Sequence, residues 1–255
     1  MEVEVRKYYS GKNLPGKTKF IYDKESKERP AWIQVEGLPD DVMFLSTRIN
    51  GKIHHYRIYL SPTIPLFLPT NYTKEEMMKY YDKFAEIYDE ETGLKNAVAA
   101  EFLFSKLQVP KDAKILDLGA GSGISAVPLI NRGYNNITLL DFSKEMLEKA
   151  KQKKELKKCN FLLQDISKLE IKSDEKFDVI FSVFAFASNS YFGNKEMQKL
   201  WEKIVYCLKP NGIFAVMGND SEPPQSLIQK IDNGMYEIIP GFKAQWYIGK
   251  RDSLI

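Results

Sequence analysis

Apolar positions follow two patterns, one before and one after about residue 60. In the first part, short apolar runs alternate with turn residues, which predicts β-strands. Residues 43–49 and 53–59 are the clearest two runs, and they flank Asn50-Gly51, a pair suited to the positive φ angles of a type I′ turn. We therefore expect a hairpin there, within a β-rich N-terminal module.

A proline-rich segment follows this module. Residues 61–70 contain Pro62, Pro65 and Pro69, and proline has no N–H with which to continue a central strand. The segment therefore predicts a linker and a domain boundary. We expect residues 1–69 to form the β-rich module with its linker, and residues 70–255 to form a second domain.

The second part alternates helical and strand patterns. Helical spacing of apolar residues covers residues 72–89, 93–107 and 195–208. Short apolar runs of strand length occupy residues 114–118, 136–140, 160–163, 177–183 and 212–217. A short helix at 225–231 and strands at 235–239 and 242–248 complete the expected elements. Strands that alternate with helices predict an α/β fold with a parallel, doubly wound sheet.

Composition excludes several classes of protein. With 44% hydrophobic and 28% charged residues among 255, the chain is typical of folded globular proteins and not of disordered ones. No apolar run approaches the roughly 18 to 20 residues of a membrane-spanning helix. The charged N-terminus also lacks the pattern of a secretory signal. We therefore expect a cytoplasmic protein with no membrane contact.

Charge and metal-ligating residues narrow the chemistry further. The 37 basic and 34 acidic side chains leave a net charge of +3, which is too small to indicate a nucleic-acid protein by itself. The two cysteines and two histidines do not have the spacing of a zinc site, so we expect no metal. The composition is compatible with a small-molecule substrate.

A glycine-rich turn is the first sign of a binding site. The strand expected near residues 114–118 runs into Gly119, Gly121 and Gly123, where the lack of Cβ atoms lets the backbone turn tightly and approach a ligand. The next strand ends in Asp141, 22 residues after Gly119. A carboxylate at that place can accept hydrogen bonds from both hydroxyls of a ribose. The two features together predict an adenosine-ribose site.

The glycine spacing separates two kinds of cofactor site. A dinucleotide site has the spacing G-x-G-x-x-G, whereas this chain has G-x-G-x-G, which disfavours a nicotinamide-dependent oxidoreductase. The third strand ends near Asp165, where a carboxylate can accept from an adenine amino group. Each of Asp117, Asp141 and Asp165 alone could instead cap a turn or a helix. Three acids at successive strand ends, in register with the glycines, favour the binding role.

Together these motifs resemble those of class I S-adenosylmethionine-dependent methyltransferases. The resemblance covers about residues 72–218. It is carried by Asp117-Leu118-Gly119-Ala120-Gly121-Ser122-Gly123, Leu140-Asp141-Phe142-Ser143, Gln164-Asp165-Ile166, Phe177-Asp178-Val179-Ile180 and Leu208-Lys209-Pro210-Asn211-Gly212. The resemblance implies a Rossmann-like seven-stranded methyltransferase sheet beside the β-rich module. It also implies S-adenosylmethionine as cofactor, S-adenosylhomocysteine as product, and no metal.

The resemblance assigns residues to the methionine half of that cofactor. The three glycines would border the methionine part, and Asp117 would hold its amino group through water. Ser182 and Val183, at the end of the fourth strand, would lie near the sulfonium. A helix before the sheet would cover the cofactor, and one of its tyrosines would contact the methionine end: Tyr80, Tyr81 or Tyr88.

The resemblance also assigns residues to the adenosine half. Asp141 would bind the ribose and Phe142 would pack beside the adenine. Asp165 and the backbone of Ile166 would recognise the adenine ring.

The acceptor of the methyl group is less determined. Residues 184–192 lack an Asn-Pro-Pro-Tyr-like element and are apolar and aromatic, which suits an acceptor with a hydrophobic body. We expect transfer to an oxygen, nitrogen or carbon of a small molecule. The alternatives are a protein or RNA substrate, docked on the β module and the lysine-rich helix at 144–158, and a non-catalytic S-adenosylmethionine-binding protein. Asp220 and His54 are candidate bases, and edge strands of the β module could form a homodimer.

Overall fold

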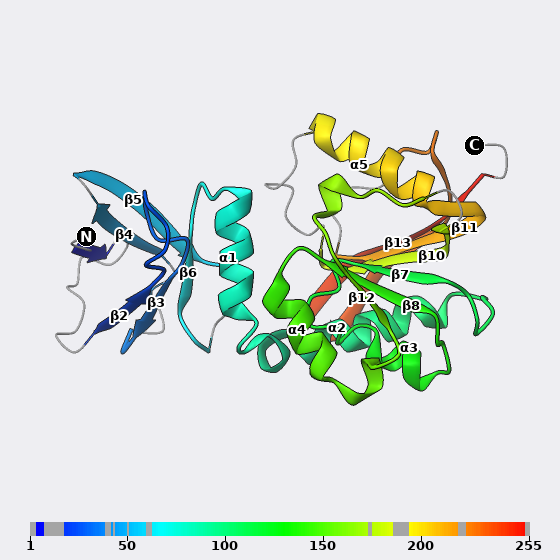
Figure 1. Ribbon diagram of the computed structural model, residues 1–255, viewed down its shortest axis with the longest axis horizontal. Coiled ribbons are helices and arrows are strands. Elements are labelled where there is room, and N and C mark those ends of the chain that lie inside the picture. Colours follow the sequence, from blue (N-terminus) through cyan, green and yellow to red (C-terminus); the bar gives the residue numbers. More distant parts are fainter. Residues whose placement is uncertain are drawn as a thin grey trace. The chain divides into compact units, whose positions relative to one another are not determined.

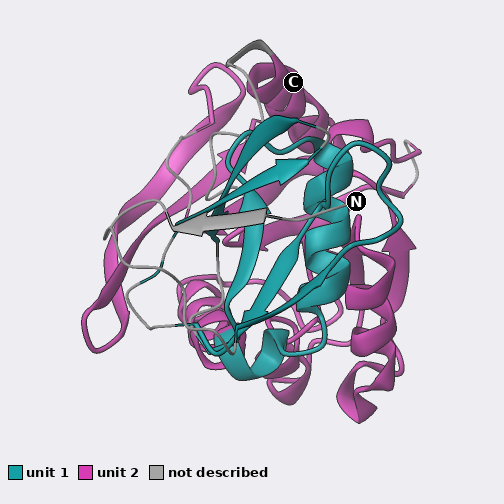
Figure 2. Ribbon diagram, turned by 90° about the vertical axis from the view of Figure 1, so that its left-hand side faces the viewer, with its two compact units in different colours: residues 1–91 teal, residues 92–255 magenta. Residues whose placement is uncertain are grey.

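The computed structural model describes residues 4–7, 18–38, 42, 44–49, 51–59, 63–172, 175–185, 194–218 and 223–252. The chain divides into two compact units, residues 1–91 and 92–255, which are coloured separately in Figure 2. This division places helix α1 (Lys74–Phe84) in the first unit and passes through helix α2 (Tyr88–Ser105). The domain boundary expected after residue 69 therefore stays a prediction.

The first unit is built on a six-stranded antiparallel sheet. Its strands are β1 (Glu4–Lys7), β2 (Lys19–Tyr22), β3 (Ile33–Glu36), β4 (Phe44–Ile49), β5 (Lys52–Ile58) and β6 (Leu66–Pro69), in the spatial order β1-β4-β5-β6-β3-β2. Its core consists of Ile33, Val35, Val42, Leu45, Tyr56 and Phe67. Strands β1 and β2 are the two edges of the sheet, and pairing of such edges into a homodimer stays a prediction.

The expected hairpin of this unit is confirmed. Strands β4 and β5 pair from Phe44 opposite Arg57 to Ile49 opposite Lys52. The two-residue connection includes Gly51, whose φ of +78° requires the left-handed region that glycine occupies without strain.

The expectation that the proline-rich segment cannot enter a sheet is wrong for its second half. Strand β6 lies between β5 and β3, with Phe67 opposite Ile58 on one side and Ile33 on the other. The three residues between Pro65 and Pro69 are apolar and buried, and all three keep their N–H groups. The prolines stand before the strand and at its end, where a missing N–H does not interrupt the ladder.

Helix α1 begins with a capping box. The Thr73 hydroxyl accepts from the Glu76 N–H, and the Glu76 carboxylate accepts from the Thr73 N–H at 2.7 Å. The same carboxylate receives two hydrogen bonds from Arg29, from Nε at 2.6 Å and from Nη2 at 2.9 Å. Since both side chains are only 13% exposed, this ion pair ties the segment before β3 to the start of the helix.

The second unit contains a seven-stranded mixed sheet (Figure 1). Its strands are β7 (Ile115–Leu118), β8 (Ile137–Asp141), β9 (Asn160–Leu163), β10 (Phe177–Val183), β11 (Leu208–Met217), β12 (Ile228–Ile239) and β13 (Phe242–Arg251), in the spatial order β12-β13-β11-β10-β7-β8-β9. Strands β9, β8, β7, β10 and β11 are parallel, whereas β13 runs antiparallel between β11 and β12. The expected Rossmann-like seven-stranded sheet is confirmed.

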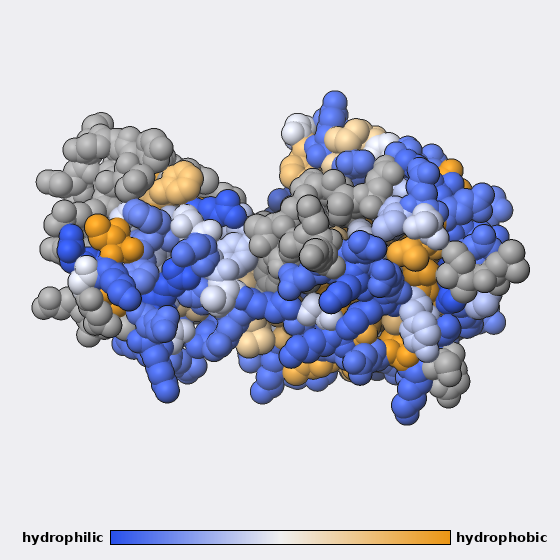
Figure 3. Space-filling model, turned by 90° about the horizontal axis from the view of Figure 1, so that it is seen from above, coloured by the Kyte–Doolittle hydropathy of each residue, from blue (hydrophilic) through white to orange (hydrophobic). Residues whose placement is uncertain are grey.

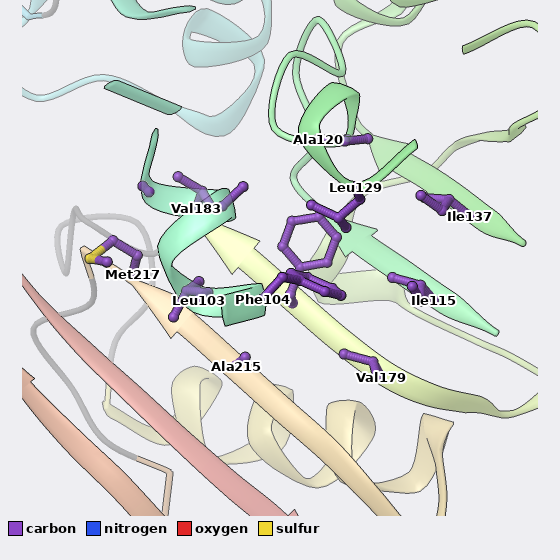
Figure 4. Close-up of a cluster of buried hydrophobic side chains, with 14 of the residues drawn as sticks. Leu103, Phe104, Ile115, Ala120, Leu129, Ile137, Val179, Val183, Ala215 and Met217 are labelled. Carbon is purple, nitrogen blue, oxygen red and sulfur yellow. The ribbon is translucent and has the colours of Figure 1, made fainter. Parts of the chain in front are cut away.

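Alternate residues of these strands face two hydrophobic cores. One core joins Ile115, Val179 and Ala215 to Leu103 and Phe104 of α2 (Figure 4). The other core joins the next residues along each strand to helix α5 (Asn194–Cys207): Leu116, Ile180 and Val216 with Leu200, Trp201 and Ile204. Period-two burial on both faces explains why the central strands read as continuous apolar runs. Two shorter helices, α3 (Val127–Asn131) and α4 (Lys144–Gln152), connect β7 to β8 and β8 to β9.

The helix expected at residues 225–231 is wrong. Strand β12 already begins at Ile228 and pairs along β13, with Ile228 opposite Arg251 and Lys230 opposite Gly249. Leu227, Ile228 and Ile231 have helical spacing, but in the strand only Ile228 of β12's first six residues is buried. Backbone pairing with the ten-residue β13 decides its conformation instead.

Two general features of the described residues bear on the earlier expectations. None of their helices combines the length and the apolar character needed to traverse a bilayer. The face seen in Figure 3 is mostly hydrophilic, with hydrophobic residues in scattered groups, which is ordinary for a protein surface.

Candidate cofactor site

The glycine-rich turn follows β7, the strand at which the sheet order reverses. Strands β8 and β9 lie on one side of β7, and β10 and β11 lie on the other. Ligands of open α/β sheets bind outside the carboxyl ends of the strands at such a switch point. Gly119, Gly121 and Gly123 follow directly and have φ angles of +76°, +54° and +72°. The turn therefore needs glycine at all three positions.

Close packing adds a second reason for the first glycine. A Cβ atom on Gly119 would overlap the Cβ of Ala185, in the segment just after β10, and would lie 3.5 Å from Cδ1 of Ile166. Segments after three different strands thus meet at this turn. The neighbouring strand β8 also holds the backbone of the turn. The carbonyl of Leu140 accepts from the N–H groups of Gly119 at 2.9 Å and Ala120 at 2.8 Å.

Asp141, at the end of β8, is buried beside this turn. Its Oδ2 accepts from the N–H of Gly121 at 2.8 Å, and its Oδ1 accepts from the N–H of Ser143 at 2.8 Å. Asp141 is not the cap of α4, because the Ser143 hydroxyl takes that role by accepting from the Met146 N–H. Both oxygens of this buried carboxylate thus hold backbone N–H groups of the residues that border the turn.

Asp117, inside β7, is more deeply buried, at 1% exposure. Its Oδ2 accepts from the Ser125 hydroxyl at 2.6 Å. Its Oδ1 has no hydrogen-bond partner among the described residues. Burial raises the pKa of Asp117 to about 7; the Ser125 hydrogen bond opposes that rise, and the negative charge of Asp141 adds to it.

The end of β9 lies beside Asp141, as the adenosine assignment requires. The N–H of Gln164 donates to the Asp141 carbonyl at 2.9 Å. Asp165 follows and caps a short 3-10 turn at Ile166–Lys168, since its Oδ1 accepts from the N–H of Ser167 at 2.8 Å. Phe142 is half-buried. The adenine roles of Phe142, Asp165 and Ile166 stay predictions.

The end of β10 has an unusual backbone. The Ser182 hydroxyl donates to the Leu118 carbonyl at 2.7 Å, so this buried side chain binds the neighbouring strand. Phe184 has a φ of +61°, and its N–H donates to the Met217 carbonyl at 2.8 Å. A non-glycine residue in the left-handed region is strained, and such strain is concentrated at functional sites. Gly218 accommodates the Phe184 ring, which a Cβ atom there would overlap.

The predicted tyrosines belong to the first unit. Tyr80 is fully buried there, with ring centroids 5.9 Å from Tyr59, 5.9 Å from Tyr81 and 5.8 Å from Phe84. Tyr88 packs edge-on against Phe84 at 5.4 Å. These contacts give the rings a packing role within that unit, and their cofactor role stays a prediction.

The two candidate bases also stay predictions. His54, on β5 of the first unit, is half-buried, and burial together with the charges of Arg29 and Lys52 lowers its pKa. Asp220 lies outside the described residues. Among the residues that the structure describes, no three or more His, Cys, Asp or Glu side chains are grouped so as to hold a metal ion.

Two polar contacts of the glycine turn were not expected from the sequence. One is the Ser125 hydroxyl on Asp117, and the other is Lys153, whose Nζ donates to the Ser122 carbonyl at 2.9 Å. Ser125 is separated from Asp117 by eight positions, and Lys153 by 31 from Ser122. A polar residue in an otherwise apolar stretch was the one available signal for Ser125.

Comparison with protein families matches part of the second unit. Residues 115–212 match the family model described as a methyltransferase domain. This part of the chain is similar to methyltransferase domains. The matched residues run from the first residue of β7 into β11, and so include the glycine turn, Asp141 and Asp165.

The chain shares part of its length with curated relatives. It is 30% identical over 152 residues to malonyl-[acyl-carrier protein] O-methyltransferase 2 of Ilyobacter polytropus, covering 58% of this chain and 56% of the relative. It is 31% identical over 130 residues to the ubiquinone biosynthesis O-methyltransferase of Rickettsia typhi, covering 48% of each. The chain thus spans about half the length of these relatives.

Solved structures share the fold at low sequence identity. A putative methyltransferase of Haloferax volcanii, in complex with the Trm112 methyltransferase activator, has a TM-score of 0.55 at 16% identity, covering 68% of this chain and 97% of that one. The magnesium protoporphyrin IX methyltransferase of Synechocystis PCC 6803, with bound S-adenosylhomocysteine, has a TM-score of 0.54 at 14% identity, covering 71% and 100%. At these identities the likeness concerns the fold.

Proposed function

We propose that this protein transfers a methyl group from S-adenosylmethionine to an oxygen, nitrogen or carbon of a small molecule. The observation that carries the proposal is the glycine turn with Asp117 and Asp141 buried beside it, at the switch point of a methyltransferase sheet. The names of the curated relatives, both O-methyltransferases, support this reaction class and favour oxygen as the acceptor atom.

The residues of the turn fit S-adenosylmethionine chemically. Oδ1 of Asp117 is a buried acceptor without a partner among the described residues, which suits the ammonium group of the cofactor. Asp141 is a carboxylate at the end of β8, the place from which an acid binds ribose hydroxyls in folds of this kind. The glycines allow the positive φ angles of the turn and its close packing against Ala185 and Leu156. S-adenosylhomocysteine, which keeps the ammonium and the ribose, would be held by the same groups.

The chain's own contribution to the reaction is binding, alignment and exclusion of water. S-adenosylmethionine supplies an already activated methyl group. The protein therefore has to hold donor and acceptor in line and keep water away. In this proposal the turn and Asp141 would hold the donor, and the strained backbone at Phe184, directly after β10, supports a role for that strand end on the acceptor side. A general base is optional for this chemistry, and His54 and Asp220 remain candidates.

The lysine-rich segment at 144–158 favours a small acceptor over an acidic macromolecule, because some of its lysines already have partners within the protein. Two of its lysines already have partners: Lys151 pairs with Glu148 at 2.8 Å, and Lys153 donates to the Ser122 carbonyl. Interleaved acids and internal bonds reduce the free positive charge that docking of an RNA would use.

The first test is calorimetric titration with S-adenosylmethionine and, in parallel, with NADH. We expect saturable binding of S-adenosylmethionine alone. Asp141→Ala should weaken it by about 1 to 3 kcal/mol, roughly 5- to 150-fold, because the ribose loses a charged acceptor. Asp178→Ala is the matched control, since Asp178 is a carboxylate at the opposite end of β10, where it accepts from Lys209 and from the Lys114 N–H.

The outcomes separate the candidate functions. Binding of NADH alone would overturn the proposal, and unchanged affinity in a folded Asp141→Ala variant would overturn the assigned site. Candidate acceptors are then screened by measuring the formation of S-adenosylhomocysteine. Small hydroxylated and carboxylated compounds form one set of acceptors, and total RNA and total protein form the other. Turnover on a macromolecule alone would replace the small-molecule acceptor with the alternative.

A further inference from the structure

Ser125 makes a buried side-chain contact with the candidate cofactor site. This contact is part neither of the β-sheet pairing nor of a helix cap. It lies between Gly123 and α3 and is 4% exposed. Its hydroxyl donates to Oδ2 of Asp117 at 2.6 Å. The turn that carries Ser125 is itself ordered, because the Ala126 N–H donates to the Gly123 carbonyl at 3.1 Å. The hydroxyl is therefore held against one oxygen of the carboxylate and not the other.

The second oxygen of Asp117 is the unusual one. Oδ1 is buried and has no hydrogen-bond partner among the described residues. Buried carboxylate oxygens without partners are rare in folded proteins. With Oδ2 engaged by Ser125, Oδ1 is the atom that is available to a ligand.

The groups that face Asp117 determine the kind of ligand. They are the carboxylate of Asp141 on β8 and the thiol of Cys159 just before β9. Burial and the charge of Asp117 raise the pKa of the Cys159 thiol to about 11, so it is neutral at ordinary pH. No cationic side chain of the described residues contacts Asp117. The negative charge of Asp141 acts on the buried Asp117, and a buried carboxylate beside a second negative charge favours a cationic ligand group.

We propose that Ser125 is a positioning residue for S-adenosylmethionine: its hydroxyl holds Oδ2 of Asp117 and so keeps Oδ1 ionised and free for the ammonium group. This inference rests on the proposed function, because the ammonium belongs to the proposed cofactor. Ser125 acts through Asp117 and does not itself touch the reacting methyl group.

The contact has a consequence that a packing role would not have. The Ser125 hydroxyl stabilises the charged form of Asp117, so its removal raises the pKa of Asp117 further. A rise of about one unit is expected when one hydrogen bond to a charged group is lost. The ammonium binds the ionised carboxylate, so the affinity for S-adenosylmethionine should fall on the acidic side first.

The experiment is calorimetric titration of S-adenosylmethionine into wild type and Ser125→Ala between pH 6 and pH 9. We expect the ratio of the two affinities to be about tenfold at pH 6 and close to one at pH 9. The ligand's own amino group titrates on the alkaline side, but equally for both proteins, so it cancels in the ratio. Ser125→Thr, which keeps a hydroxyl, should restore the wild-type profile.

A matched control and a ligand-free measurement complete the test. Ser46→Ala removes another buried serine hydroxyl that contacts a titratable side chain, His55, in the first unit, and should not change the profile. The midpoint of Asp117 is followed by carbon-13 NMR of its carboxyl group without ligand. We expect it to rise in Ser125→Ala.

Each outcome bears on one of the two claims. A loss of affinity that is equal at every pH, or a Ser125→Thr variant that behaves like Ser125→Ala, would overturn the positioning role. An unmoved Asp117 midpoint would overturn it whatever S-adenosylmethionine does. If the midpoint moves as expected while wild type binds no S-adenosylmethionine, the proposed function fails and the Ser125–Asp117 coupling stands.

Discussion

Replacing Asp117 with asparagine isolates the cost of burying this carboxylate. Burial raises the pKa of Asp117 to about 7 from an ordinary 3.8. Between these values the native state binds more protons than the unfolded state, so the free energy of unfolding falls as the pH rises. We therefore expect wild type to lose stability through this group from about pH 4 up to pH 8, whereas Asp117→Asn has no such group to titrate.

The magnitude follows from the size of the shift. A rise from 3.8 to about 7 corresponds to about 4 kcal/mol at pH 8 and about 1 to 2 kcal/mol at pH 5. Asparagine keeps an acceptor for Ser125 but buries an amide N–H₂ without a partner, which costs about 1 to 3 kcal/mol at any pH. The difference between variant and wild type should therefore change by about 3 kcal/mol from pH 5 to pH 8, whatever that constant cost is.

The assay is urea unfolding at several pH values between 5 and 8. Trp201 and Trp246 report on the second unit, and a Trp32→Phe background removes the tryptophan of the first unit. Asp178→Asn is the control of opposite sign: burial acts against it, but the ammonium of Lys209 lowers the pKa of Asp178. Its stabilising contribution is fully present above the ordinary pKa of 3.8 and is lost only at lower pH, so the difference between Asp178→Asn and wild type should stay constant between pH 5 and pH 8.

Two outcomes would contradict the expected titration of Asp117 or its role in the site. If the difference between Asp117→Asn and wild type is the same at pH 5 and pH 8, Asp117 does not titrate in this range and its burial has been misjudged. If the variant gains stability at pH 8 but binds S-adenosylmethionine as wild type does, the carboxylate is costly without serving the proposed cofactor, against the usual exchange of stability for function.

Two further substitutions test the turn and the first unit. Gly119→Ala should lower the free energy of unfolding by about 2 to 4 kcal/mol and abolish measurable S-adenosylmethionine binding, because of the positive φ and the overlap with Ala185; calorimetry and urea unfolding check both effects. Arg29→Met should destabilise the first unit by about 2 to 4 kcal/mol, since it leaves Glu76 half-buried without its bidentate partner; unfolding followed at Trp32 measures it, and Glu76→Gln in the same background should recover part of the loss.

The parts of the fold that the sequence predicted correctly are those governed by local chemistry. The hairpin depended on the turn preference of Asn50-Gly51, and strand β9 on a single apolar run at 160–163. The glycine turn was predictable because its three alternate positions have positive φ angles, which few residues besides glycine adopt. Asp141 was predictable because it directly follows the apolar run at 137–140, so the sequence itself places an acid at the end of that strand.

The errors arose where pairing partners far away in the sequence decide the outcome. Strand β6 is placed by β5 and β3, and its flanking prolines misled because only their positions within the ladder matter. Strand β12 is placed by β13, which lies beyond it in the chain. No local pattern in residues 225–231 records that partner, since the exposed face of a hairpin strand places few demands on side chains.

The chemistry of the candidate site depends on burial, which the sequence does not record. In a sequence, an aspartate that is ionised at the surface cannot be distinguished from one that is half-protonated in the interior. At Asp117 the difference arises from three-dimensional facts: near-complete burial, one oxygen held by Ser125, one oxygen without a hydrogen-bond partner in the described part of the chain, and a second carboxylate nearby. A cation that reaches Oδ1 removes the unpaired acceptor and offsets the repulsion at once. The features that make the ligand-free site costly are thus the ones that would make it selective for a positively charged cofactor over a neutral analogue of the same shape.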